Sequence, residues 1–432
     1  MKKSTLLEGS QGPVSTTPDD WIRNEAVSFS PDSSESCNAA LDRVIASIGD
    51  RVKILGFGEA LHGSRDLLLL RNRIFRHLVE AHGYRAIAIE SSFPRSRVVN
   101  EYVAGRGPAS YDALQDTGFS YGFRRLEGNR ELVEWMREYN ADPGHRVKLR
   151  FYGFDSPTEM MKSDSPRQLL EFALAYLTSA DPATGQEYRG RIGPLIGEDA
   201  GWENPAAAMD PAQSVGLSPA ATALRIETEE LITELQVRRP GLVAAGDEDR
   251  YREAVQYATA ARQLLTYHAG VARKSRERVA RLLGMRDAMM ADNLAYILAC
   301  EKDRGKVFAF AHNSHLKHGR TEWQLGTVLN AWWPVGAHLS ARLGAGYAVI
   351  GSAAGVSEAH GIGQPEPGTL EARLTAAAGP ARFIPTHGVQ GLPSAFADLP
   401  VRSGSTKNST YFALTPQSIT DFDWIAVLDS IE

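Results

Sequence analysis

Short apolar runs alternate with helical segments along most of this chain, and this alternation restricts its fold more than any other feature. VKILGF at 52–57 is apolar and bounded by glycine, which is typical of a buried strand, and AIAIE at 86–90 repeats the pattern. Between them, apolar residues recur at helical spacing after Ser64, which is placed to cap a helix, and stop before Gly83. A strand, a helix and a second strand in this order form a βαβ unit, so the two strands should be parallel.

The same pattern continues towards the C-terminus. Further strands are predicted at 147–155, 306–313, 346–351, 409–414 and 421–429, and further helices at 36–48 and 129–140. These elements predict an α/β fold, in which a mostly parallel central sheet is flanked by helices.

The segment 160–300 differs from the rest, because long helical patterns follow one another without an intervening strand. We expect a helical insertion here that covers the active-site cleft, within a single α/β domain spanning 20–432. Inside the insertion, 181–219 is rich in glycine, proline and alanine and longer than an ordinary loop, so it is either a lid or a solvated connector. Residues 1–19 are polar and are expected to form a mobile N-terminal segment.

Composition and charge argue against several classes of protein. Lys and Arg number 47 against 52 Asp and Glu, and the net charge of -5 gives no electrostatic case for binding nucleic acid. No stretch approaches the ~18 apolar residues of a membrane span, and the N-terminus lacks the apolar region of a signal peptide. Cys37 and Cys300 are too few for a disulfide framework or a cysteine-based metal site, so a cytoplasmic location is expected.

Acidic residues and histidines stand where the predicted strands end. Following the four strands in chain order, these residues are Glu59 and His62, then Glu90, then Asp155, then His312 and His315. The carboxyl ends of parallel strands lie at one edge of a sheet, where open α/β folds bind their ligands. Each residue alone has a structural alternative, such as capping a helix, but their agreement over four strands predicts one shared site.

A first chemistry for this site is hydrolysis by base-activated water. His62 would take a proton from water, because the ordinary imidazole pKa of ~6.5 lies near neutral pH, and Glu59 or Glu90 would orient its ring. His312 or His315 would then protonate the leaving oxygen.

Three further residues are candidates for roles beside this base. Arg71, one to two turns into the helix after Ser64, either stabilises an oxyanion at the same edge or forms a surface salt bridge. Asp155 and Trp333 are candidates for contacts with the substrate, although a tryptophan is also a common core residue.

Two other chemistries use overlapping residues. In one, a metal ion activates the water and is held by Glu59, His62, Glu90 and His312, although the HExxH spacing is absent. In the other, a serine is the nucleophile. Ser120 lies in a G-x-S-x-G match, but a nucleophile elbow requires a strand before the serine and a helix after it, and the flanking residues are polar and interrupted by glycine. We interpret this match as accidental.

The order of several motifs resembles the erythromycin esterase family: GEALHGSRDLLLLRNRIFRHLVE, AIAIESSFPRSRVVNEYV, GFDSP, RDAMMADNLAYIL and FAHNSHL. The resemblance covers most of the chain. It implies hydrolysis of an ester, the macrolide lactone in the resistance enzymes, without a covalent intermediate and without a required cofactor. It also implies that His62 activates water, supported by Glu59, Arg71, Glu90 and His312.

The resemblance leaves the exact substrate, the oligomeric state and the presence of a metal open, since related folds in the wider superfamily bind metal or haem. The expected partner is a small-molecule ester or lactone. The alternatives are a metal-dependent hydrolase that uses the same residues, a natural-product tailoring enzyme, and a ligand-binding protein of the same fold.

Overall fold

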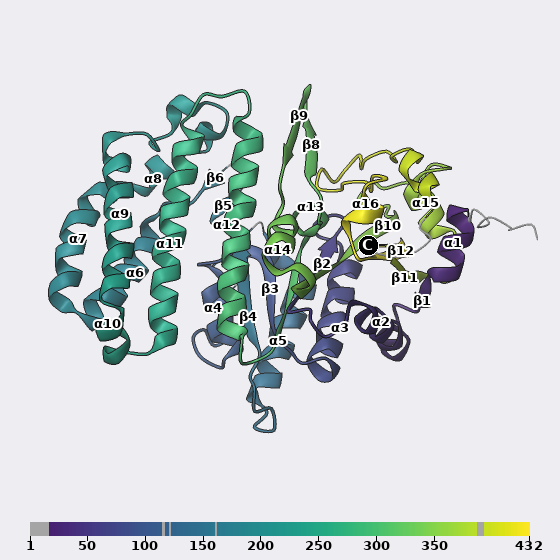
Figure 1. The fold of residues 1–432 in the computed structure, drawn as a ribbon, viewed down its shortest axis with the longest axis horizontal. Coiled ribbons are helices and arrows are strands. Elements are labelled where there is room, and N and C mark those ends of the chain that lie inside the picture. Colours follow the sequence, from purple (N-terminus) through teal and green to yellow (C-terminus); the bar gives the residue numbers. More distant parts are fainter. Residues whose placement is uncertain (1–16, 115–116, 121, 160–161, 387–392) are drawn as a thin grey trace, which may run out of the picture.

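The computed structural model describes residues 17–114, 117–120, 122–159, 162–386 and 393–432. Its centre is an eight-stranded sheet with helices on both faces (Figure 1). In spatial order the strands are β1 (Val27–Phe29), β11 (Ala381–Pro385), β12 (Trp424–Ser430), β10 (Tyr347–Val356), β2 (Ile54–Glu59), β7 (Lys306–His312), β3 (Tyr84–Ser92) and β4 (Arg150–Asp155). Neighbouring strands from β12 to β4 are parallel, whereas β11 is antiparallel to both β12 and β1. The predicted α/β fold with a mostly parallel sheet is confirmed.

The parallel strands are buried on both faces, because successive side chains belong to two different hydrophobic cores. In β2, Leu55 and Phe57 belong to the first core and Ile54 to the second. The first core is covered by α2 (Ser34–Ile48), α3 (Arg65–Ala81), α4 (Ser96–Val103) and α5 (Glu127–Ala141). The second is covered by α1 (Pro18–Glu25), α12 (Arg278–Glu301), α14 (Val335–Leu343), α15 (Leu370–Thr375) and α16 (Ser418–Asp421).

The order of the strands departs from the chain order at the centre of the sheet. β2 and β3 are joined through α3 and are parallel, as predicted, but β7 lies between them. The chain reaches β7 after passing through the whole helical region. The ends of β2, β7 and β3 are therefore neighbours, although β7 is remote from the other two in sequence.

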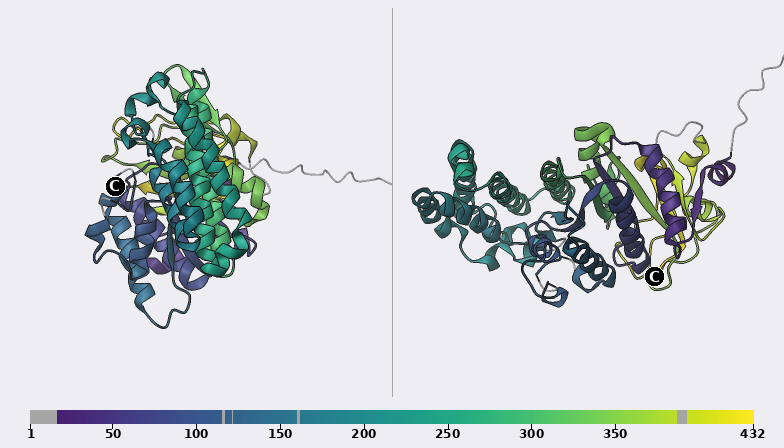
Figure 2. Two further views of the ribbon diagram at one scale, coloured as in Figure 1. Left: turned by 90° about the vertical axis from the view of Figure 1, so that its left-hand side faces the viewer. Right: turned by 90° about the horizontal axis from the view of Figure 1, so that it is seen from below.

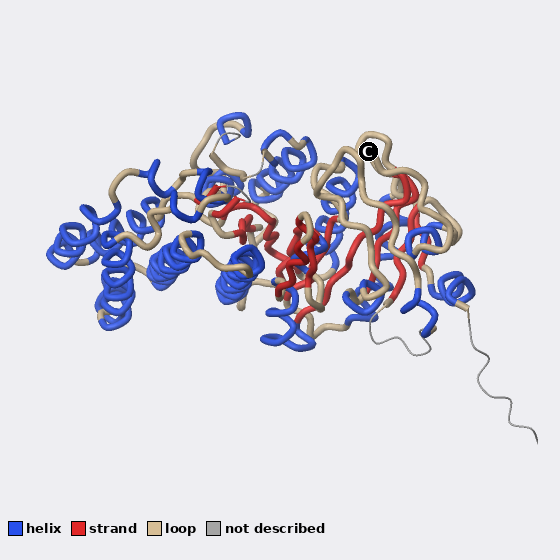
Figure 3. The backbone as a smooth tube through the Cα atoms, turned by 90° about the horizontal axis from the view of Figure 1, so that it is seen from above, coloured by secondary structure: helices blue, strands red, loops and turns tan. Residues whose placement is uncertain are grey.

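The helical region forms a lobe with a core of its own. Its helices are α6 (Arg167–Ala180), α7 (Pro182–Ile196), α8 (Asp199–Trp202), α9 (Pro219–Val237), α10 (Arg239–Ala245) and α11 (Glu248–Val271). The lobe stands beside the sheet, beyond the edge strand β4, in Figure 1, and it lies at the same end of the molecule in the right-hand view of Figure 2 and in Figure 3. α12 connects the two parts, since it packs on α11 and on β4. That the lobe covers the active-site cleft stays a prediction.

The segment 181–219 contains helices where the sequence predicts a loop. Asp181 caps α7 by accepting a hydrogen bond from the Thr184 N–H, and Ile192 is fully buried. Gly185 permits close packing of α7 on α6, because a Cβ at this position would lie 2.3 Å from Thr178 Cα. The glycines that suggested a flexible lid therefore serve helix packing in at least this one place.

Two other predictions are corrected. The strand predicted at 409–414 is irregular, because Asn408 Oδ1 accepts hydrogen bonds from the N–H and hydroxyl of Thr410 and bends the chain locally. The predicted mobile segment 1–19 lies largely outside the described residues, but its last two residues form the start of α1.

Two hairpins and one short α-helix lie near the carboxyl edge of the sheet. They are the hairpins β5 (Thr158–Glu159) with β6 (Lys162–Ser163) and β8 (Thr321–Leu325) with β9 (Val328–Trp332), and the short helix α13 (Asn313–Leu316). Within the described part of the chain, no helix is both long enough and apolar enough to cross a bilayer.

Candidate active site

Four neighbouring strands bring the predicted acids and histidines to one edge of the sheet. His312, the last residue of β7, pairs in register with Glu59, the last residue of β2. Glu90 of β3 accepts a hydrogen bond from the His312 N–H at 2.8 Å. The structure therefore brings together six of the predicted residues: Glu59, His62, Glu90, Asp155, His312 and His315.

A tight turn after β2 presents His62. Gly63 has a φ of 88°, in the left-handed region that glycine tolerates, and this lets the chain turn into α3. Ser64 then caps α3, as predicted, by accepting a hydrogen bond from the Leu67 N–H. The C-terminal segment holds the turn, since the His62 N–H donates to Thr410 Oγ1 at 2.9 Å.

The imidazole of His62 is oriented by one carboxylate and faces another. Its Nδ1 lies 2.6 Å from Glu59 Oε1, and because a carboxylate only accepts, Nδ1 carries a proton. Its Nε2 lies 3.9 Å from Glu90 Oε1, which is too long for a direct hydrogen bond. The side chain is 25% exposed, and in the neutral ring Nε2 is the unprotonated nitrogen.

Arg286 of α12 joins two carboxylates behind His62. Its Nε and Nη2 donate to both oxygens of Asp155, at 3.0 and 2.7 Å, and Nη2 also donates to Glu90 Oε1 at 2.9 Å. Asp155 is completely buried. In this structure Asp155 holds Arg286, and Arg286 holds Glu90; the contact of Asp155 with substrate stays a prediction.

His315 extends this buried ionic network. Its Nδ1 donates to Asp287 Oδ1 at 2.7 Å, and its Nε2 lies 3.3 Å from Glu90 Oε1. Burial opposes a charge on this ring, but the carboxylates of Asp287 and Glu90 outweigh burial and raise the pKa of His315 to about 10. Asp287 is held in turn by Trp332 Nε1 at 2.7 Å. His315 is thus buried and paired at both nitrogens, since Arg286 Nη1 also lies 3.2 Å from its Nε2.

His312 has the opposite electrostatic character. Its Nδ1 accepts from the Ser314 N–H at 3.1 Å, so its Nε2 carries the proton and donates to the Thr410 carbonyl at 2.8 Å. Burial, reinforced by the neighbouring His62, lowers the pKa of His312 to about 3. His312 is therefore a neutral ring with both nitrogens engaged, which does not suit the predicted role of protonating a leaving oxygen.

Arg71 is buried beside Glu59 and makes no surface salt bridge. Its guanidinium donates to Asn72 Oδ1, to Asn129 Oδ1 at 2.7 Å and to the Gly128 carbonyl at 3.0 Å, which ties α3 to the start of α5. A cavity of about 10 Å³, roughly the room that one water molecule needs, is lined by Glu59, Arg71, Glu90 and Asn129 together with apolar side chains. This space does not admit a large substrate, so the contacts favour support of Glu59 over direct oxyanion stabilisation.

Burial and neighbouring charges shift the pKa values of His62, Glu59 and Glu90. Burial lowers the pKa of His62, but the charges of Glu90 and Glu59 outweigh burial and raise it above its ordinary value. Burial raises the pKa of Glu59 despite the neighbouring His62. Burial also acts on Glu90, but His315, His62 and Arg286 hold the pKa of Glu90 well below its usual range.

The four residues predicted for a metal site do not offer their donor atoms to one point. Glu59 contacts Nδ1 of His62 and Glu90 faces Nε2, so the two carboxylates lie at different nitrogens of one ring. Both nitrogens of His312 already have hydrogen-bond partners. Among the described residues, this predicted donor set does not fit a single ion.

Several residues of the site are missed by sequence reasoning. Arg286 and Asp287 are buried, charged neighbours in α12, and Thr410 lies in a segment predicted as a strand. Arg286 and Asp287 begin the segment RDAMMADNLAYIL, but a charged pair within a helical pattern ordinarily indicates a solvent-exposed position. Trp333 follows β9 and is 56% exposed, with the Arg320 guanidinium over its ring, and its contact with substrate stays a prediction.

The G-x-S-x-G serine has a structural role. Ser120 is buried, its Oγ accepts from the Ser92 N–H at 2.8 Å, and its N–H donates to Ser91 Oγ at 3.0 Å. These bonds attach its loop to the end of β3, where Ser91 and Ser92 lie. The geometry supports the interpretation that the match is accidental.

Comparisons with known proteins were made for sequence and for fold. A sequence model of the family described as erythromycin esterase matches residues 79–430. The erythromycin esterases type II and type I of Escherichia coli are 25% and 28% identical to this chain over 142 and 131 residues. These alignments span 32% and 30% of this chain and the same shares of the two relatives, so about a third of each relative's length is matched.

Three solved structures share the fold. A Bacillus cereus protein superposes with a TM-score of 0.73 at 17% identity, covering 96% of this chain and 97% of its own. A succinoglycan biosynthesis protein gives 0.71 at 18% identity, with 98% of both chains covered. A mutant of the erythromycin esterase EreC in its open conformation gives 0.65 at 18% identity, covering 90% and 94%.

Proposed function

Because this chain belongs to the erythromycin esterase family, we propose that it hydrolyses an ester or a lactone, with a macrolide ring as the leading candidate. The observation that carries the proposal is the setting of His62. Glu59 holds its Nδ1–H, while its Nε2 faces Glu90 across 3.9 Å on a side chain that is 25% exposed. A water molecule between Nε2 and Glu90 would be oriented by both.

The proposed reaction proceeds without a covalent enzyme intermediate. His62 Nε2 takes a proton from water as the water oxygen attacks the carbonyl carbon of the ester. The tetrahedral intermediate then expels the alkoxide, and the imidazolium of His62 returns its proton to this leaving oxygen. This assignment replaces His312 and His315 as proton donors, because His312 is neutral and fully hydrogen-bonded and His315 is locked between carboxylates.

The neighbouring residues prepare His62 for this role. Glu59 fixes the tautomer and stabilises the imidazolium that forms during the reaction. Glu90 orients the water, and Asp155, Arg286 and His315 keep Glu90 ionised and in place. We assign these three as positioning residues.

The reaction class is tested by incubating the protein with a panel of macrolides and simple esters, with and without a chelator. The expected result is a product heavier than its substrate by one water, found by mass spectrometry in both conditions. Activity that is lost with the chelator and restored by a divalent ion would favour a metal-dependent hydrolase. Tight binding of an unchanged ligand would favour a ligand-binding protein, and a product without added water would favour a tailoring enzyme.

The pH dependence of kcat/KM provides a second prediction. A base must be unprotonated, and the pKa of His62 is raised, so activity should increase with pH through a midpoint above the ordinary value of ~6.5. Glu59→Gln keeps a hydrogen-bond acceptor for Nδ1 but removes a negative charge, so the midpoint should move to lower pH. A pH–rate profile of both proteins checks this, and an unchanged midpoint would contradict the electrostatic role of Glu59.

The exposed ring of Trp333 gives a third prediction. If it packs on an apolar substrate, Trp333→Ala should raise KM about 5- to 10-fold with little change in kcat, as expected for the loss of about 1 kcal/mol of aromatic contact. Ile226→Ala, at a 61% exposed position in α9, is the matched control and should leave KM unchanged. Equal KM values for the Trp333 variant and the wild type would remove Trp333 from the binding surface.

A further inference from the structure

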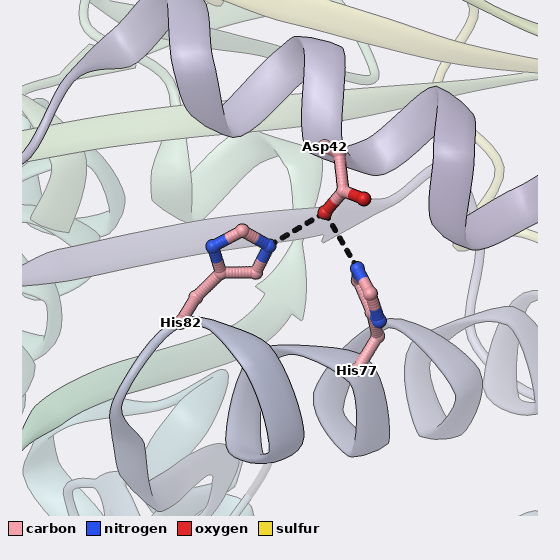
Figure 4. A group of neighbouring side chains, drawn as sticks. All are labelled: Asp42, His77 and His82. Atoms are coloured by element: carbon pink, nitrogen blue, oxygen red, sulfur yellow. Dashed lines mark hydrogen bonds and ion pairs between the residues drawn. The ribbon is translucent and has the colours of Figure 1, made fainter.

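A second cluster of histidine and carboxylate side chains lies away from the candidate active site. Asp42 of α2 faces His77 and His82, which lie near the end of α3 and directly after it (Figure 4). His77 Nε2 lies 2.6 Å and His82 Nε2 lies 2.7 Å from the same oxygen, Asp42 Oδ1. Three potential ligand atoms from two helices therefore converge.

The cluster is separated from the active site by the length of α3. This helix begins beside the active-site turn at Ser64 and ends at the cluster, and at 1.5 Å per residue the two ends are roughly 25 Å apart. The first core fills the space beneath α2 and α3, and neither Asp42 nor the two histidines contributes to the network around Glu90. The cluster is an independent feature of the molecule.

The donor atoms and their exposure suit a transition-metal ion. Two imidazole nitrogens and one carboxylate oxygen form a donor set that zinc binds, with water able to complete a tetrahedron. The histidine side chains are 11% and 20% exposed, and that of Asp42 is 52% exposed, so the ligands are held by the helices but open to an incoming ion. The two rings meet edge to face with centroids 5.2 Å apart, which keeps both Nε2 atoms on the same side.

We propose that Asp42, His77 and His82 form a binding site for one divalent transition-metal ion, with Zn²⁺ as the representative ion. The ion replaces the hydrogen atoms that now lie between the two imidazoles and the carboxylate, and each neutral ring then carries its proton on Nδ1. The bound ion links α2 to α3, the helices that precede and follow β2. Its expected effect is therefore on stability, because an ion that binds only the folded chain shifts the unfolding equilibrium.

The test measures Zn²⁺ binding to the full chain after removal of metals by a chelator. Isothermal titration with Zn²⁺ alone should show one equivalent of Zn²⁺ per chain whose binding requires the cluster. The unfolding temperature should rise when Zn²⁺ is added. In His77→Gln/His82→Gln this equivalent should be lost or its Kd raised more than about 10-fold. Glutamine retains an N–H donor for Asp42, so this variant preserves the hydrogen bonds while removing the imidazole ligands.

Two controls locate the ion. His145→Gln changes a surface histidine that stacks on Tyr139, and it should bind Zn²⁺ as the wild type does. His62→Asn, which alters the active site, should retain the equivalent and the shift in unfolding temperature. Hydrolytic activity of the double glutamine variant should equal that of the wild type.

Two results would overturn the proposal. One is the absence of Zn²⁺ binding and of a thermal shift in the wild type at millimolar Zn²⁺. The other is binding that is unchanged in His77→Gln/His82→Gln but lost in His62→Asn, which would place the ion in the active site. Circular dichroism of the double variant separates a lost ligand from a lost fold, and Asp42→Asn provides a second, exposed substitution for the same comparison.

Discussion

Replacement of His62 by alanine is expected to lower kcat about 100- to 10,000-fold, the range that general-base catalysis contributes. The reason is geometric, since Nε2 of His62 faces Glu90 across 3.9 Å and has no hydrogen-bond partner among the described residues, whereas both nitrogens of His312 are occupied. Initial rates on the substrate found by the mass-spectrometric panel measure the loss. Far-UV circular dichroism and a cooperative unfolding transition should be retained, because the side chain is partly exposed.

His62→Asn sharpens this test. Asparagine offers a hydrogen bond to Glu59 but cannot take a proton from water at neutral pH, so it should be as inactive as alanine if His62 is the base. His145→Ala is the matched control, because His145 also lies near a carboxylate, with its Nδ1 4.0 Å from Asp142, but on the outer surface. Hydrolysis by His62→Ala at the wild-type rate would refute the assignment of the base.

Arg286→Met should lower the free energy of unfolding by about 3–5 kcal/mol, the usual loss when one partner of a buried ion pair is removed. Methionine fills a similar volume, but it leaves the buried carboxylates of Asp155 and Glu90 without the guanidinium that both contact. Urea unfolding of the variant and the wild type measures the difference. Arg286→Lys should lose less, because it keeps the charge but not the bidentate contact with Asp155.

The matched control is Arg342→Met. Arg342 is half exposed and makes one ion pair, with Asp292 at 3.1 Å, so its loss should cost no more than about 1 kcal/mol. An Arg286 variant as stable as this control would show that the network around Glu90 does not hold the site together. Loss of activity without loss of stability would instead move Arg286 from positioning to catalysis.

Much of the fold is predictable from local sequence. Strands buried on both faces appear as short apolar runs, and six of the predicted runs correspond to β2, β3, β4, β7, β10 and β12. The cap at Ser64 and the turn at Gly83 mark α3 correctly, because these residue types have strong local preferences. Local patterns fail where a glycine serves tight packing, as at Gly185, and where side-chain hydrogen bonds bend an apolar segment, as at Thr410.

Short strands are harder to predict from local sequence. β1 and β11 are not predicted, because three to five residues give too little periodicity to distinguish a strand from a loop. Both strands are stabilised by pairing with segments far away in the chain, such as β11 with β12. Such pairing cannot be predicted from the residues next to a strand in the sequence.

The sequence by itself determined which elements form and which residues bring chemistry to the ends of the strands, since periodicity, capping and residue type act over a few neighbours. Tertiary structure alone decided that β7 enters between β2 and β3, so that His312 stands beside Glu59, and that Arg286 arrives from α12 to bind Asp155 and Glu90. It also decided that the pKa of His312 is lowered while that of His315, three residues later, is raised. The physical reason is that strand order and pKa depend on burial and on partners remote in the chain, which become neighbours only when the whole sheet has formed.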